Sequence, residues 1–142
     1  MKEKTEFREV FKKFIDGLAL QSITLVGIQT RFAPDLIVKN SDLNVNVMES
    51  YGYKQKPKKE LNFLATLVLT AKENGGDDEI IRIEVTYAIK FASAMKITEE
   101  IFNSYKQTNI RLNIIPYFRE IIQNLTARMN LPAFTLPLFK LK

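Results

Sequence analysis

Few side chains in this chain of 142 residues could carry out catalysis. The sequence has no His and no Cys, which removes the commonest general base, the thiolate nucleophile and the commonest metal ligand. The carboxylates gather in two short runs, at 77–79 and 99–100, that are typical of a turn and of a helix start. Neither run indicates a catalytic pair. We therefore expect no enzyme, no metal site and no cofactor.

Two other stretches have the composition of ligand sites. Gly75 and Gly76 are an isolated pair, without the Walker or dinucleotide-binding pattern that would place a phosphate beside them. The cationic stretch 54–59 follows Tyr51 and Tyr53, and cations beside aromatic rings are used against phosphates and bases. A solvated loop between strands has the same composition. We favour the loop and expect no nucleic-acid partner, with a small basic nucleic-acid-binding or protein-interaction module as the alternative function.

The residues from Asn113 to Leu138 indicate a different chemistry, which is contact between apolar surfaces. They begin as an amphipathic helix, break at Leu131-Pro132 and continue as an apolar segment over 133–139. Prolines keep that segment from becoming a helix or a strand. One interpretation is a last helix and a tail folded back on the core. The other is an apolar surface that a partner polypeptide covers.

The same region resembles the C-terminal signature of the SecB protein-export chaperones, and the likeness extends over about residues 20–139. The residues that carry it are Ile115, Pro116, Tyr117, Phe118, Arg119 and Glu120, then Ala127-Arg128, Leu131-Pro132 and Leu136-Pro137. The resemblance implies four antiparallel strands, a crossover and a long helix that ends in a Pro-containing apolar segment. It also implies an ATP-independent holdase that binds non-native polypeptides.

Two departures from the SecB pattern concern SecA, the motor with which that family works in export. SecB proteins are acidic and have an acidic tail, whereas this chain has a formal net charge of +5 and stops at Lys142. Gly27 and Arg31 align with the first strand, where SecB has acidic residues that are used against SecA. Like charges across an interface weaken binding and slow the encounter. We therefore expect no tight SecA binding. The clients are either general export substrates or one dedicated partner, such as an antitoxin.

The resemblance also implies how subunits assemble and where clients bind. SecB-like proteins form dimers of dimers by pairing edge strands and packing their long helices, so we expect a homotetramer or at least a homodimer. For the client groove we expect residues from the exposed side of the second strand and from the C-terminal elements, some of which will be plain core. The candidates are Leu43, Val45, Val47, Ile115, Phe118, Leu131, Phe134 and Leu136.

The composition is that of one globular domain over residues 1–142. The chain is 46% hydrophobic and 26% charged, and its length is enough to bury a substantial core. No apolar run approaches the ~20 residues that cross a bilayer. The first six residues are not followed by the uncharged segment of a secretory signal. A cytoplasmic location without membrane insertion is expected.

An amphipathic helix is predicted over residues 5–17, which lie outside the SecB resemblance. Thr5 is the expected N-cap and Gly17 the expected stop. Apolar residues recur at helical spacing between Lys and Glu, namely Phe7, Val10, Phe11, Phe14, Ile15 and Leu18. A basic amphipathic helix can lie on a membrane surface, but helices of this length more often pack on their own domain or on a neighbouring subunit.

The remaining elements complete an α+β fold with a four-stranded antiparallel sheet, in which the loop after the second strand and the turn at 74–77 give an antiparallel meander. The expected strands are 20–32, with an irregularity at Gly27, then a strand centred on 43–47 and followed by a polar loop at 51–59, and finally 61–70 and 81–91. A short helix is predicted to start at Thr98. A long helix follows, capped by Asn113 or starting near Asn109 with a kink at Pro116.

Overall fold

The computed structural model describes residues 2–37, 43–56, 60–73 and 75–131 of the chain. In chain order the elements are helix α1 (Lys2–Asp16), strand β1 (Leu18–Phe32), the 3-10 turn η1 (Pro34–Leu36), strands β2 (Leu43–Lys56), β3 (Glu60–Glu73) and β4 (Glu79–Ser93), helix α2 (Glu99–Tyr105), the π-helical segment η2 (Lys106–Ile110) and helix α3 (Arg111–Arg128). The predicted α+β fold, with a short helix, a long helix and an extra N-terminal helix, is confirmed.

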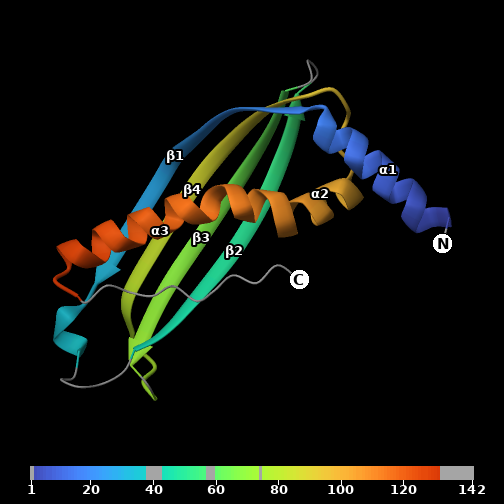
Figure 1. The fold of residues 1–142 in the computed structure, drawn as a ribbon. Helices are drawn as coiled ribbons and strands as arrows, with labels where there is room; N and C mark the ends of the chain where they lie inside the picture. The colour runs from blue at the N-terminus through green and yellow to red at the C-terminus, as the bar shows by residue number, and fades with distance from the viewer. Residues whose placement is uncertain (1, 38–42, 57–59, 74, 132–142) are drawn as a thin grey trace.

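The strands form one antiparallel sheet in the order β1-β4-β3-β2 (Figure 1). Only β2, β3 and β4 follow one another as a meander. The meander predicted from the loop after the second strand and the turn after the third is confirmed. β1 joins it by pairing with β4, which therefore has a neighbour on each side, and every second residue of β4 from Ile81 to Ser93 is buried on the covered face. β1 and β2 are therefore the edge strands.

Strand β2 is longer than the sequence pattern predicted. The polar stretch that begins at residue 51 continues the strand as far as Lys56, so the loop predicted there starts later. Gln55 explains part of the difference. Its side-chain amide donates to the carbonyl of Met95 at 3.0 Å and accepts from the N–H of Ile97 at 2.8 Å. These hydrogen bonds fasten the end of β2 to the segment that leads into α2.

Strand β1 contains two shifts in its pairing with β4, one between Leu20 and Ser22 and one between Leu25 and Gly27. The second shift confirms the irregularity predicted at Gly27. Each shift adds a residue to β1 and turns the following side chains over, as a β-bulge does. As a result, β1 residues on the same face of the sheet as the buried β4 residues are not always two positions apart in the sequence. They are Leu18, Leu20, Ile23, Leu25, Ile28, Thr30 and Phe32.

Helices α2 and α3, joined by η2, run diagonally across one face of the sheet, which we call the inner face (Figure 1). The core lies between this helical layer and the inner face. α3 contributes Ile114, Phe118 and Ile122, all fully buried, and its side chains Ile121, Leu125 and Met129 pack against the core while partly exposed. This is the apolar face that a helical period predicts. The opposite face of the sheet is called the outer face below.

The starts of the two C-terminal helices differ in how well they were predicted. Thr98 caps α2 as expected, because its hydroxyl accepts from the N–H of Ile101 at 3.2 Å. Asn113 is not a cap, since α3 begins at Arg111 and continues without a break from η2, so the predicted alternative of an earlier start near Asn109 is the better one. Pro116 therefore lies inside the helix, where it cannot donate a backbone hydrogen bond to the turn before it.

Helix α1 packs on its own domain, as its length and pattern favoured. It starts before Thr5, so that residue is not its cap. Phe14 is fully buried and meets Tyr105 edge to face, with 5.6 Å between ring centroids. Phe7, Phe11 and Ile15 also pack against the core, each partly exposed.

Gly17 ends α1 because of a close approach between backbones. Its carbonyl accepts from the N–H of Ala94 at 3.0 Å, and a Cβ at this position would lie 2.9 Å from the Cβ of Ala94. The residue thus joins the start of β1 to the chain just after β4. Gly17 is the stop that the sequence predicted, and its backbone is not in the left-handed region.

We expect Gly17→Ala to lower the free energy of unfolding by about 1–3 kcal/mol, because the added methyl group must displace Ala94. Gly52→Ala is the matched control. A Cβ there meets nothing within 4 Å, so the substitution should stabilise the protein by about 0.4–1 kcal/mol by restricting the unfolded chain. Urea unfolding of both variants measures the difference. Equal effects would contradict the close approach.

Candidate functional site

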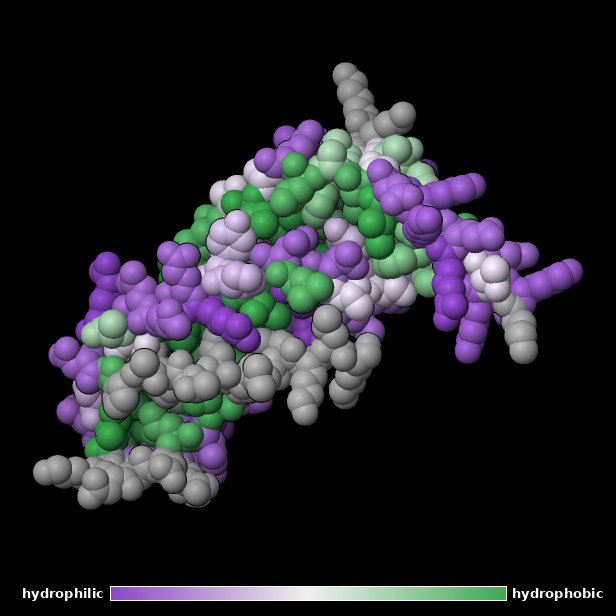
Figure 2. Space-filling model, in the orientation of Figure 1, coloured by the Kyte–Doolittle hydropathy of each residue, from purple (hydrophilic) through white to green (hydrophobic). Residues whose placement is uncertain are grey.

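Apolar side chains remain accessible on the inner face at both sides of α3, as Figure 2 shows. The helix begins beside β2, where Arg111 contacts Glu49, and later residues from Tyr117 to Leu125 lie beside β1. Because it crosses the sheet in this way, α3 leaves part of each edge strand uncovered. We call the first region the β2 strip and the second the β1 groove.

The β2 strip consists of Leu43, Val45 and Val47. These three residues were expected on the exposed side of the strand. The structure instead turns them toward the helical layer, where they are half-buried and pack against the core, while Asn44 and Asn46 are exposed on the outer face. The strip thus presents apolar side chains along a sheet edge, next to a core that supports them.

The other predicted groove residues have different surroundings. Phe118 is fully buried and Ile115 is 8% exposed, so both are core residues, as was expected of some of the candidates. Leu131 is partly buried and packs against the core. Phe134 and Leu136 lie outside the residues that the structure describes. The structure therefore brings together only the β2 residues as an accessible set.

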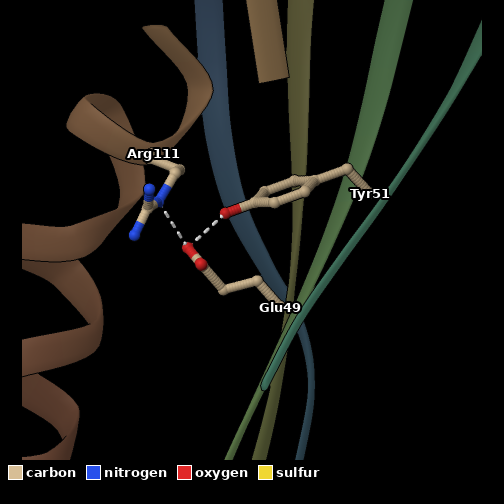
Figure 3. Close-up of polar contacts among 3 residues, drawn as sticks. All are labelled: Glu49, Tyr51 and Arg111. Carbon is tan, nitrogen blue, oxygen red and sulfur yellow. Dashed lines mark hydrogen bonds and ion pairs between the residues drawn. The ribbon is translucent and has the colours of Figure 1, made fainter. Parts of the chain in front are cut away.

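A polar cluster bounds the β2 strip at its far end (Figure 3). Glu49 Oε1 accepts from Arg111 Nε at 2.9 Å and from the hydroxyl of Tyr51 at 2.7 Å. Both charged side chains are only 20% exposed, so solvent screens the pair less than a surface pair. Burial is the main cause that raises the pKa of Tyr51, and the hydrogen bond and charge of Glu49 raise it further. The hydroxyl of Tyr51 therefore stays protonated and acts as a donor. The cluster joins β2 to the first residue of α3.

The β1 groove was not predicted from the sequence. It has a volume of about 360 Å³ and lies between β1 and α3, with the ring of Tyr87 also in its wall. Leu25 and Ile28 are 45% and 44% exposed, and Tyr117 is 47% exposed. The lining is Ile23, Leu25, Ile28, Tyr87, Tyr117, Glu120, Ile121, Asn124 and Leu125. Half-exposed aliphatic side chains on an edge strand are typical of a surface that a partner covers.

The hydroxyl of Tyr87 adds a polar feature to this groove. It is buried and has no hydrogen-bond partner among the described residues. Burial, with a smaller contribution from the charge of Glu120, raises the pKa of Tyr87 to about 12. A buried hydroxyl without a partner is costly. A segment that enters the groove with a backbone carbonyl would remove that cost.

The two bulges of β1 explain why the groove was missed. The residues Ile23, Leu25 and Ile28 are separated by two and then three positions, so no alternation marks them as one face. Only the density of apolar residues in this strand, together with Tyr117 in the Pro116–Glu120 motif, pointed to a surface here.

The basic and aromatic residues of β2 do not form a nucleic-acid site together. Tyr51 and Tyr53 point to the inner face and are half-buried, whereas Lys54 and Lys56 are exposed on the outer face. Cations and rings therefore lie on opposite sides of the sheet, and bases could not stack beside the ammonium groups. This arrangement weakens the nucleic-acid interpretation of the stretch.

Two further features concern metal ions and membranes. The part of the chain that the structure describes holds no group of three or more acidic, His or Cys side chains that could bind a metal ion. None of the helices described is both long and apolar enough to cross a membrane.

The arrangement of elements matches that of a known chaperone. The chain is similar to the Mycobacterium tuberculosis Rv1957 SecB-like chaperone, solved in complex with a ChAD peptide from the Rv1956 HigA1 antitoxin. The TM-score is 0.75 and the identity 19%, over 93% of this chain and 97% of that chain. The fold is SecB-like. At this identity, what the SecB-like proteins share with the chain is the order and packing of helices and strands.

A second solved structure is more distant. It is a protein of unknown function from Streptococcus agalactiae, with a TM-score of 0.48 and 11% identity over 85% of this chain and 97% of that chain. No family model matches the sequence, and no curated protein matches it. The SecB-like assignment of the fold therefore rests on the Rv1957 structure.

We expect Arg111→Met to lower the free energy of unfolding by about 1–3 kcal/mol, because it leaves the carboxylate of Glu49 largely buried without its cation. Arg82→Met is the control. The Arg82–Glu79 pair is 39% and 36% exposed, and such pairs contribute less than about 1 kcal/mol. Adding Glu49→Gln to Arg111→Met should recover part of the loss in urea unfolding. Equal losses in both Arg variants, or no recovery, would contradict this role.

Proposed function

We propose that this protein is an ATP-independent chaperone that binds non-native polypeptides on the inner face of its sheet. The β2 strip is the main contact. The observation that carries the proposal is the row of Leu43, Val45 and Val47, half-buried on an edge strand and supported by the core. An extended client can place apolar side chains on this row and add main-chain hydrogen bonds along the edge of β2 that no described strand covers.

The residue types agree with binding rather than catalysis. Without His or Cys, and without a phosphate-binding glycine pattern, the chain does not resemble a nucleotide-dependent machine. Aliphatic side chains without fixed polar partners suit clients of many sequences. The SecB-like fold supports the same class of function, because the neighbour of known structure is a chaperone in complex with an antitoxin peptide. The proposed clients are thus unfolded polypeptides for export or a dedicated partner such as an antitoxin.

The β1 groove is the proposed contact between subunits of a homo-oligomer. Leu20, Leu25, Val26 and Ile28 are each exposed by about half, which is unfavourable for a monomer in water. A second subunit would cover them by pairing along β1 and packing its long helix beside α3. It would also bring backbone carbonyls to the Tyr87 hydroxyl. Assembly in this way leaves the β2 strips free for clients.

We expect the protein to suppress the heat aggregation of two unrelated clients, such as citrate synthase and malate dehydrogenase, at near-stoichiometric ratios without ATP. Val45→Asp should weaken suppression about tenfold, since a charge desolvated against the client costs at least the ~1.4 kcal/mol that this factor represents. Val45→Thr should have a smaller effect in the same direction. Asn46→Asp, one residue away on the outer face, is the control and should suppress normally. No suppression of either client by the wild type would disprove the proposal.

We expect light scattering to give a mass well above 16.4 kDa for the wild type at micromolar concentration. Leu25→Asp should shift the protein toward the monomer, because a carboxylate replaces an apolar side chain in the subunit contact. Met48→Asp is the matched control, as Met48 is also an exposed apolar residue of an edge strand but points to the outer face. A monomeric wild type, or equal dissociation of both variants, would contradict assembly through β1.

A further inference from the structure

The outer face of the sheet has a chemistry of its own. The strand register places its residues in rows across β1, β4, β3 and β2. Among the described residues the charged side chains on this face are six cations, Arg31, Lys54, Lys56, Lys72, Arg82 and Lys90, and three carboxylates, Glu60, Glu79 and Glu84. The cations lie in two groups at opposite ends of the strands. This face is therefore positive at both ends.

At one end the register sets two like charges side by side. Arg31 of β1 is directly opposite Arg82 of β4, and Lys72 follows on β3 close to the same end. Like charges directly opposite each other destabilise a sheet. Glu79 accepts from Arg82 at 3.2 Å, which offsets part of that repulsion. An arrangement that lowers stability in this way is expected where a ligand compensates for it.

At the other end Lys90 and Lys54 share a row, with Lys56 in the next row. Glu60 lies among them and is 2.9 Å from the ammonium group of Lys90. The hydrogen bond with Lys90, together with the charges of Lys90 and Lys56, lowers the pKa of Glu60. The two cationic ends are about 26 Å apart, since Arg82 and Lys90 are eight residues apart on one strand.

Between the two ends, Glu84 lies in the row next to Arg82, and the two central rows contain no charged side chain. Two central rows contain Gly, Ala, Thr and Ser next to Leu64, which is 50% exposed, and Met48 on β2 is 51% exposed. A centre without charged side chains and a margin with charged ones agree with the composition of a protein–protein interface, whose centre is depleted of charge. The described residues of this face include no aromatic ring, so bases have no stacking partner.

We propose that the outer face docks an acidic protein surface. Carboxylates of the partner contact the Arg31–Arg82 end and the Lys54–Lys90 end, and its apolar or small side chains cover Met48 and Leu64. The partner is a folded or extended protein with two acidic groups about 26 Å apart. This docking is independent of client binding, which uses the inner face.

A labelled peptide with two clusters of four glutamates, separated by eight uncharged residues that include leucines, tests the proposal by fluorescence anisotropy at about 50 mM salt. A peptide of the same composition with contiguous glutamates is the second probe, and it should bind more weakly. The double variant Arg31→Glu with Lys54→Glu should weaken binding of the spaced peptide about tenfold or more. Glu84→Gln removes a carboxylate from the outer face and should strengthen binding of the spaced peptide.

Lys4→Glu with Lys12→Glu is the matched control, because it changes the net charge equally on exposed residues of α1. An equal loss in this control would show a general charge effect and overturn the proposal. Equal binding of the two peptides would also overturn the proposal. So would a 20-base-pair DNA duplex that binds the wild type more tightly than the spaced peptide does and no longer binds the face variant. The face variant should still suppress aggregation of the clients. If the wild type binds the spaced peptide but suppresses no aggregation, the chaperone proposal fails and the docking proposal stands.

Discussion

The diagonal packing of α3 on the sheet is the interaction on which the rest of the molecule depends. The helix buries three of its own side chains completely against the sheet, namely Ile114, Phe118 and Ile122. It therefore cannot move along the sheet without opening the core. Its direction is set at one end by the contact of Arg111 with Glu49. Because one helix is too narrow to cover four strands, the same packing that closes the core leaves the two edge strands uncovered. The β2 strip and the β1 groove follow directly from this geometry.

The sheet separates two kinds of surface. Its inner face presents aliphatic side chains whose partners need only be apolar, whereas its outer face presents separated charges whose partner must match their positions. Strand β2 shows the division residue by residue, with Val45 and Val47 inward and Asn46 and Met48 outward. The partners that we propose for the two faces would therefore not compete for the same side chains.

Much of the fold could be predicted from the sequence, because local patterns determine it. The buried stripe of α3, the cap at Thr98 and the bulge near Gly27 all follow from spacing and residue type. The place of β1 beside β4 could not be predicted, since alternation shows which face a residue occupies but not which strand it pairs with. The site was predicted only in part. The strip at Val45 was found with the wrong orientation, and the groove at Leu25 was hidden because its bulges disrupt the period of two.

The π-helical segment η2 changes the spacing between buried residues along the helical layer. Buried residues recur every four positions at Ile101 and Tyr105, and again from Ile110 through Thr126, but five positions separate Tyr105 from Ile110. The extra residue lies within the wider π turn, so both halves of the stripe still face the sheet. One residue has thus been accommodated in a packed helix without a change in the core on either side. A helix that contains one extra position in one turn is therefore compatible with this architecture, and Arg111 lies directly after the segment that contains it.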